Sequence, residues 1–244
     1  LNPDLVVAMG AGLQAGMLLG TIEKAVLLDV LPLSLGVETQ GGLTSRIIPR
    51  NSPLPVSEAR VFSTASDRQT SMDIHVLQGE RELALDNVSL GQFQLDGIPP
   101  ALRGVAKVEV AFEADVDGIV SVSAKELLSD NEVKVKLAST KLLDLQEISD
   151  HVEEAVRLTE EDRMAREGIE AIMVAENLLA AAEGALKDVG CPKPDTAAYQ
   201  VMQAASALRA ALAGGETERI QTLCQMLLKK LPALRQKTRT APYL

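Results

Sequence analysis

The stretch that decides the fold is VEVAFEADVDGIVSVSA, residues 108–124. Apolar side chains occupy alternate positions on both sides of Asp117-Gly118, a dipeptide that favours a tight turn between two strands. Strict alternation is typical of a strand with one face in the core and the other in water. These residues therefore predict a β-hairpin with Phe112 on its buried face.

The same period of two extends outward from this hairpin over residues 33–137. Short alternating stretches are separated there by Gly, Pro, Asn and Asp, which are turn residues. Roughly eight strands of ordinary length fit into this span, and that number favours two packed sheets.

Beyond Lys141 the apolar spacing becomes helical, and Asp144 with Glu147 is suited to a capping box. We expect helices from Asp144, then over about 160–189, 195–213 and 216–231, with Pro232 closing the last one. The predicted fold class is a β-sandwich domain followed by an α-helical lid or bundle, an all-β plus all-α architecture of two subdomains.

Composition limits the kinds of function. The chain of 244 residues has 24 Lys and Arg against 34 Asp and Glu, a net charge of −10, which disfavours nucleic acid and anionic membranes as partners. Aromatic residues make up only 2%. With two cysteines and two histidines in no shared motif, no metal site and no catalytic residue is predicted.

One motif points to a different class of protein. Gly10-x-Gly12-x-x-Ala15, followed by Asp29, imitates a dinucleotide-binding fingerprint. However, Asn2-Pro3-Asp4 predicts a helix that begins before the glycines, so the strand and turn that the fingerprint needs are missing. A nucleotide-binding enzyme is therefore the weaker hypothesis. A further alternative takes the helices as an oligomerisation or structural module.

Four ordered motifs are more specific. The segments VLLDVLPLSLGVET (26–39), IHVLQGER (74–81), NVSLGQFQLDGI (87–98) and DGIVSVSAK (117–125) resemble the seventy-kilodalton heat-shock chaperones of the bacterial DnaK type. The resemblance is to the C-terminal substrate-binding region of that family. The branch that serves iron–sulfur cluster scaffold proteins (HscA) is the alternative, indicated by IPRN at 48–51.

The resemblance implies a division of the chain into five parts. They are a terminal helix remnant of a nucleotide-binding domain (1–22), an interdomain linker (23–32), a β-sandwich peptide-binding subdomain (33–140), an α-helical lid (141–234) and a flexible tail (235–244). The linker residues would be Val26, Leu27, Leu28 and Asp29.

The implied function is the binding of extended hydrophobic segments of unfolded proteins, under ATP-dependent allosteric control in the full-length protein. On this prediction the chain itself is not an enzyme and holds no cofactor, because ATP and Mg²⁺ would belong to a nucleotide-binding domain outside it. The implied partners are client peptides, a J-domain co-chaperone and a nucleotide exchange factor. The implied location is the bacterial cytoplasm.

The resemblance also implies site residues. The peptide pocket would be lined by Val37, Phe62, Met72, Ile74 and Val108. The peptide backbone would be held at Glu38, Thr39 and Gln40, with Gln40 and Ala65 forming an arch, and the lid would be latched by Arg81 with Asp162 and by Arg103 with Glu176. Gln40 departs from the family, which often has a large apolar residue there, so peptide selectivity is expected to differ.

The end of the chain carries one more expectation. Residues 238–244, TRTAPYL, are basic and end in an apolar residue. At high concentration they would occupy the groove of a neighbouring molecule as a pseudo-substrate.

Overall fold

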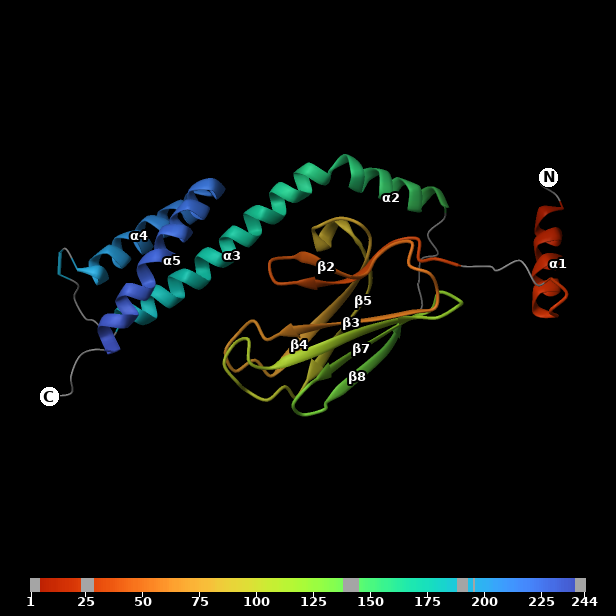
Figure 1. The fold of residues 1–244 in the computed structure, drawn as a ribbon, viewed down its shortest axis with the longest axis horizontal. Coiled ribbons are helices and arrows are strands. Elements are labelled where there is room, and N and C mark those ends of the chain that lie inside the picture. The colour runs from red at the N-terminus through yellow and green to blue at the C-terminus, as the bar shows by residue number, and fades with distance from the viewer. Residues whose placement is uncertain (1–4, 23–28, 138–144, 188–192, 195, 240–244) are drawn as a thin grey trace. The chain divides into compact units, whose positions relative to one another are not determined.

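One N-terminal helix, then the strands and then the remaining α-helices follow one another along the chain in the computed structural model, which describes residues 5–22, 29–137, 145–187, 193–194 and 196–239. In these described ranges, eight strands form two four-stranded sheets, one in the order β2-β1-β4-β5 and the other in the order β3-β6-β7-β8 (Figure 1). Their bounds are β1 Leu35–Thr39, β2 Leu43–Ile48, β3 Val56–Ser63, β4 Ser71–Gln78, β5 Val88–Asp96, β6 Lys107–Ala114, β7 Val120–Glu126 and β8 Glu132–Leu137.

The hairpin predicted at residues 108–124 is β6 and β7, paired antiparallel with Phe112 opposite Val122. Gly118 has φ +74°, the left-handed conformation that glycine adopts without strain. Asp115 stabilises the turn by accepting hydrogen bonds from the backbone N–H groups of Asp117 and Ile119, both at 2.9 Å. Val108, Phe112 and Val122 are fully buried, so the alternation identifies the core face correctly.

The helices are α1 Val6–Leu18, α2 Leu145–Arg157, α3 Thr159–Lys187, α4 Ala197–Gly214 and α5 Thr217–Arg239, with a short 3-10 turn at Ala84–Asp86. Thr196 caps α4 by accepting a hydrogen bond from Tyr199 N–H at 3.2 Å. Gly215, at φ +68°, ends that helix in the left-handed conformation. α5 does not end at Pro232 as predicted, because the proline lies inside the helix.

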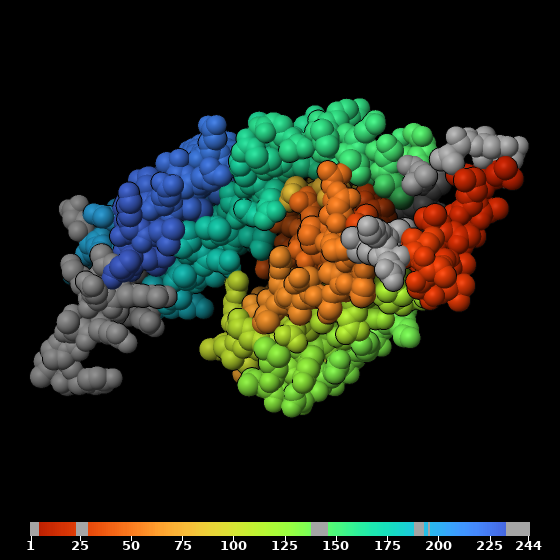
Figure 2. All heavy atoms as spheres, turned by 45° about the vertical axis from the view of Figure 1, so that its right-hand side comes forward, coloured from red at the N-terminus to blue at the C-terminus, as the bar shows by residue number. Residues whose placement is uncertain are grey.

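A second core lies among α3, α4 and α5, built half from alanine and half from larger apolar side chains. Small residues let helix backbones approach closely, and leucines fill the spaces that remain. Figure 2 shows α5, in blue, lying against the blue-green α3. The fully buried members are Ala175, Ala182, Val201, Leu208 and Leu227.

Residue contacts divide the chain into two units. Unit 1 comprises Leu1–Gly36, Arg46–Gly79 and Ser89–Ile148, and unit 2 comprises Val37–Ser45, Glu80–Val88 and Ser149–Leu244. The predicted fold class, a β-sandwich domain followed by an α-helical lid, is therefore wrong in separating strands from helices. The chain is a mixed α and β structure with two sheets and several helices, because parts of β1 and β2 belong to the same unit as α3, α4 and α5.

Some predicted segments lie outside the described residues, among them Val26, Leu27, Leu28, Asp144 and the end of the tail at 240–244. The predicted domain boundaries stay predictions. Within the described part of the chain, no helix combines the length and the apolar character that crossing a membrane requires.

Candidate functional site

The segment between β4 and β5, residues 80–88, is held in shape by Asn87. Its side-chain N–H group donates to the backbone carbonyls of Arg81 and Leu83 and to the Thr44 hydroxyl, at 2.8–3.0 Å. Its side-chain oxygen accepts from Arg81 N–H at 3.0 Å. One amide side chain thereby uses both its donors and its acceptor to fix a turn that carries two oppositely charged residues, Arg81 and Glu82.

Arg81 forms a two-pronged ion pair with Asp162 of α3. Its Nε and Nη2 lie 2.7 and 2.8 Å from the two carboxylate oxygens, and the side chains are only 14% and 7% exposed. Parallel N–H···O bonds of this kind are among the strongest in proteins and fix orientation as well as distance. The hydrogen bond and the charge of Asp162 raise the pKa of Arg81 above its ordinary value, so the guanidinium stays charged.

Further charges surround this pair, and the sequence did not indicate them. Asp86 and Glu154 lie 3.2 and 3.7 Å from the Arg81 guanidinium. Arg166, one helical turn after Asp162, pairs with Glu82 at 2.7 Å. Residues 82 and 166 are far apart in the chain, and neither belongs to a motif, so only the fold brings them together.

The turn between β1 and β2 also contacts α3. A Cβ atom added at Gly41 would lie 2.6 Å from Ile169 Cγ2 and 3.2 Å from Met173 Sδ, so the helix rests directly on the backbone of this turn. Gly41 has φ +84°. The turn is closed by a bond from Gly42 N–H to the Thr39 carbonyl at 3.1 Å. Ion pairs with the 80–88 segment and an apolar contact with this turn therefore join α3 to the strand-forming part of unit 2.

The five predicted pocket residues all lie on strands. Val37 on β1, Ile74 on β4 and Val108 on β6 are buried, at 3%, 3% and 0% exposure. Phe62 on β3 and Met72 on β4 are half-buried, and Phe62 lies opposite Val108 in the strand register. Burial places Val37, Ile74 and Val108 in the core, whereas the assignment of all five residues to a peptide pocket comes from the resemblance and stays a prediction.

The remaining predicted residues are placed differently. Gln40 is exposed in the β1–β2 turn, next to Thr39, whose hydroxyl donates to the Leu43 carbonyl at 3.0 Å. Ala65 is exposed, and its N–H donates to the Gln69 side chain. The arch stays a prediction.

The second latch of the resemblance, Arg103 with Glu176, also stays a prediction. Arg103 N–H donates to the Asp67 carboxylate at 2.8 Å, and Glu176 is exposed on α3. Of the two pairs, the structure brings together Arg81 and Asp162. Asp29, the described member of the predicted linker, accepts a hydrogen bond from Leu54 N–H at 2.8 Å through its carbonyl.

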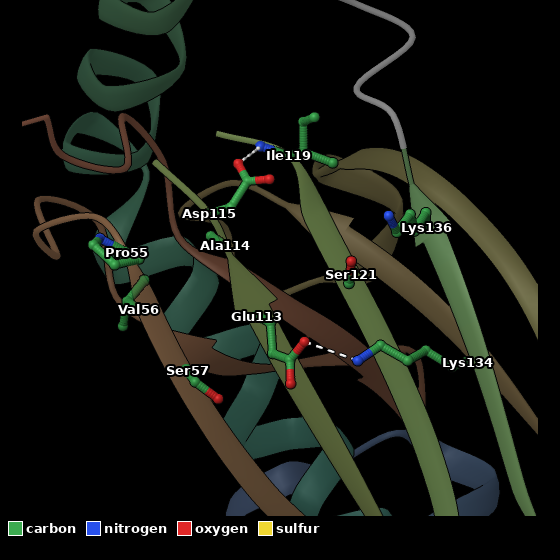
Figure 3. Close-up of a pocket in the computed structure, with 10 residues that line it drawn as sticks. All are labelled: Pro55, Val56, Ser57, Glu113, Ala114, Asp115, Ile119, Ser121, Lys134 and Lys136. Atoms are coloured by element: carbon green, nitrogen blue, oxygen red, sulfur yellow. Dashed lines mark hydrogen bonds and ion pairs between the residues drawn. The ribbon is translucent and has the colours of Figure 1, made fainter. Parts of the chain in front are cut away.

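Unit 1 has an open hollow on the outer face of the β3-β6-β7-β8 sheet. Figure 3 shows Glu113 turned toward Lys134 across it, and the two form an ion pair at 2.9 Å. Pro55, Val56 and Ile119 contribute apolar surface, while Ser57, Ser121 and Lys136 add polar groups. Because its charges largely compensate one another, this hollow has no clear preference for a ligand charge.

Comparisons with known proteins give one family. The family model described as Hsp70 protein matches residues 1–240. The chain is 44% identical over 229 residues to the chaperone protein DnaK of Methanothermobacter thermautotrophicus, covering 94% of this chain and 38% of that protein. It is 43% identical over 242 residues to the chloroplastic stromal 70 kDa heat shock-related protein of Pisum sativum, covering 99% of this chain and 34% of that protein. It is 52% identical over 183 residues to the chaperone protein dnaK of Cyanidioschyzon merolae, covering 75% of this chain and 30% of that protein.

These matches correct the narrower prediction that the chain is the C-terminal substrate-binding region of the family. They are to Hsp70 proteins as such, the family model extends over residues 1–240, and the chain spans about a third of the length of these relatives. The assignment that stands is the family. The predictions that the chain is not an enzyme and holds no cofactor are corrected as well, because both were deduced from the assignment to that region and the matched family is one of ATP-binding chaperones.

ATP and Mg²⁺ are the groups that the Hsp70 family binds. Mg²⁺ is held by carboxylates together with phosphate oxygens. In the described ranges, no three His, Cys, Asp or Glu side chains gather closely enough to hold a metal ion. Gly10 and Gly12 lie inside helix α1 and not in a turn between a strand and a helix. The described residues do not fit a Mg²⁺–nucleotide site, and no step through ATP is derived.

Proposed function

Because the chain belongs to the Hsp70 family, the DnaK-like heat-shock chaperones, we propose that it binds extended hydrophobic peptide segments of unfolded proteins. One observation carries the proposal. In unit 2 a long helix, α3, rests on the β1–β2 turn and is tied to the neighbouring 80–88 segment by charged side chains. Ion pairs of this kind form and break without unfolding either element, which suits a helix that covers and releases a bound segment.

The aliphatic strand residues supply the affinity in this proposal. A buried leucine contributes about 1.5–3 kcal/mol, and a micromolar complex needs about 8 kcal/mol. Hydrogen bonds to the peptide backbone near Glu38, Thr39 and Gln40 provide the remainder. Since backbone bonds do not read side chains, binding is broad in sequence, with Val37, Phe62, Met72, Ile74 and Val108 selecting one apolar side chain.

The experiment is a fluorescence-anisotropy titration of a labelled, leucine-rich, extended peptide with the whole chain. We expect micromolar binding, weakened at least tenfold in Met72→Gln and in Val108→Phe. Asp73→Asn is the matched control, because Asp73 is exposed on the same strand as Met72. Unfolding midpoints check that each variant is folded. Equal peptide affinity in all the folded variants would contradict the proposed pocket. Absence of peptide binding by the unmodified chain would contradict the proposed function.

We also propose, from the family, that ATP controls this binding in the full-length protein. A J-domain co-chaperone and a nucleotide exchange factor are the proposed partners beside client proteins, and the bacterial cytoplasm is the proposed location. Calorimetric titration of the chain with Mg²⁺-ATP measures whether these residues bind nucleotide themselves. A peptide affinity unaffected by ATP and these partners in the full-length protein would contradict the proposed control.

A further inference from the structure

The charges that tie α3 to the 80–88 segment alternate in sign on both sides. The segment has a positive charge at Arg81 and a negative one at Glu82, and the helix has a negative charge at Asp162 and a positive one at Arg166. Positions 162 and 166 are one turn apart on one face of the helix. Each side therefore presents two adjacent charges of opposite sign, in matching order.

This order has a consequence for the position of the helix along its axis. If α3 shifted by one turn, about 5–6 Å, one native pair would be lost and the other would be replaced by two like charges. A shift in one direction sets Arg166 against Arg81, and a shift in the other sets Asp162 against Glu82. A same-sign arrangement on each side, such as two arginines facing two carboxylates, would lose one pair on either shift but would bring no like charges together.

The two ion pairs differ in exposure, and therefore in what they contribute to the position of α3. Arg81 and Asp162 are nearly buried, whereas Arg166 is 47% exposed and Glu82 is 20% exposed. Exposed pairs contribute little to stability but still decide between alternative arrangements through repulsion. Arg166 also pairs with Glu170 at 2.8 Å on its own helix, which keeps its guanidinium on the face that meets Glu82.

We propose that Glu82 and Arg166 are positioning residues that set the axial register of α3 against the 80–88 segment. Their purpose rests on the proposed function, since a helix that covers a bound segment and releases it must return to one register. The register itself does not depend on a peptide. Hydrogen exchange and spin-label distances measure the register without a peptide, so their outcome is separate from that of the peptide titration.

Hydrogen exchange tests the pair. We expect amides in residues 159–173 to exchange two- to tenfold faster in Glu82→Arg and in Arg166→Glu, where like charges meet, than in the unmodified chain. Arg163→Glu is the matched control, because in the part of the chain that the structure describes Arg163 forms its ion pairs along α3 itself, with Glu160 and Glu167. Single reversals that exchange no faster than this control would overturn the proposal.

The double variant Glu82→Arg/Arg166→Glu separates pairing from register. It keeps both ion pairs but places two positive charges at 81 and 82 and two negative ones at 162 and 166. Spin labels at Leu85→Cys and Glu167→Cys, with Cys191 and Cys224 replaced by alanine, report the distance. We expect one distance in the parent and a second population in the double variant, displaced by about one helical turn. A single, parent-like distance in the double variant would show that apolar packing sets the register, and the proposal would fall.

Discussion

The β6–β7 hairpin and the α3 contacts of unit 2 are stabilised by different forces. The hairpin buries alternate apolar side chains on one face, and every partner in its register lies within 20 residues in the sequence. The start of α3 is held by ion pairs to residues about 80 positions away and by a close approach to a glycine turn. The local hydrophobic pattern of the sequence is therefore sufficient to predict the hairpin. The contacts of α3 cannot be predicted in this way, because they join residues that meet only in the folded chain.

The comparison is tested most strongly by removing apolar volume from the hairpin. Phe112→Ala deletes a fully buried ring, and we expect a loss of about 3–5 kcal/mol in the free energy of unfolding. Urea denaturation measures it. Glu113→Ala, the next residue on the exposed face, is the control and is expected to change little. Equal effects of the two substitutions would mean that the hairpin does not carry the core of its sheet.

Removing one partner of the buried ion pair should have the next largest effect. Arg81→Ala leaves the Asp162 carboxylate buried without its cation, and we expect a loss of about 2–3 kcal/mol, below that of a fully enclosed pair because water still reaches Arg81. Thermal and urea unfolding measure the change. Lys134→Ala breaks the exposed ion pair with Glu113 and should hardly change the free energy of unfolding measured by the same methods.

The glycine turn gives a sharper test with a built-in control. In Gly41→Ala the alanine has to adopt a left-handed backbone conformation, and its methyl group also clashes with the side chains of Ile169 and Met173. In Gly42→Ala, at φ +73°, the backbone conformation is also unfavourable, but among the described residues the methyl group has no neighbour to clash with. We expect a loss of about 1–2 kcal/mol for the first and about 1 kcal/mol for the second. Only Gly41→Ala should speed hydrogen exchange in α3. Equal exchange in both variants would show that α3 does not rest on this turn.

The smallest expected effect is a pH dependence in the strand-rich unit. Burial raises the pKa of Glu126, but hydrogen bonds from the Ser129 hydroxyl and from the N–H groups of Ser129 and Leu128 outweigh it, and the net direction is below the ordinary 4.5. A carboxylate with a lowered pKa stabilises the folded state above that value, and the contribution is lost as pH falls through the folded pKa.

Unfolding midpoints at pH 7, 5, 4 and 3 measure this contribution. The loss of stability on acidification should be shallower in Glu126→Gln than in the unmodified chain, because the variant has no proton to take up at this position. If the stability of the two proteins falls equally with pH, Glu126 does not contribute to the pH dependence of folding.

Local patterns predicted the hairpin, the eight strands and the helical second half, since each follows from spacing within a few residues. They misplaced the end of α5, which continues past Pro232 to Arg239. They did not predict that parts of β1 and β2 share a unit with the helices. The pairing of Arg81 with Asp162 came from the family resemblance, while Glu82, Arg166 and the role of Asn87 had no signal in the sequence.

The two ends of α3 respond to different changes in the solvent. Its first turns meet their neighbours through charges, and its later turns lie in an alanine-rich core with α4 and α5. Dissolved ions weaken attraction between exposed charges but leave apolar burial largely intact. Rising ionic strength should therefore weaken the partly exposed Glu82–Arg166 pair near the start of this 29-residue helix, while the nearly buried Arg81–Asp162 pair and the apolar contacts with α4 and α5 change little.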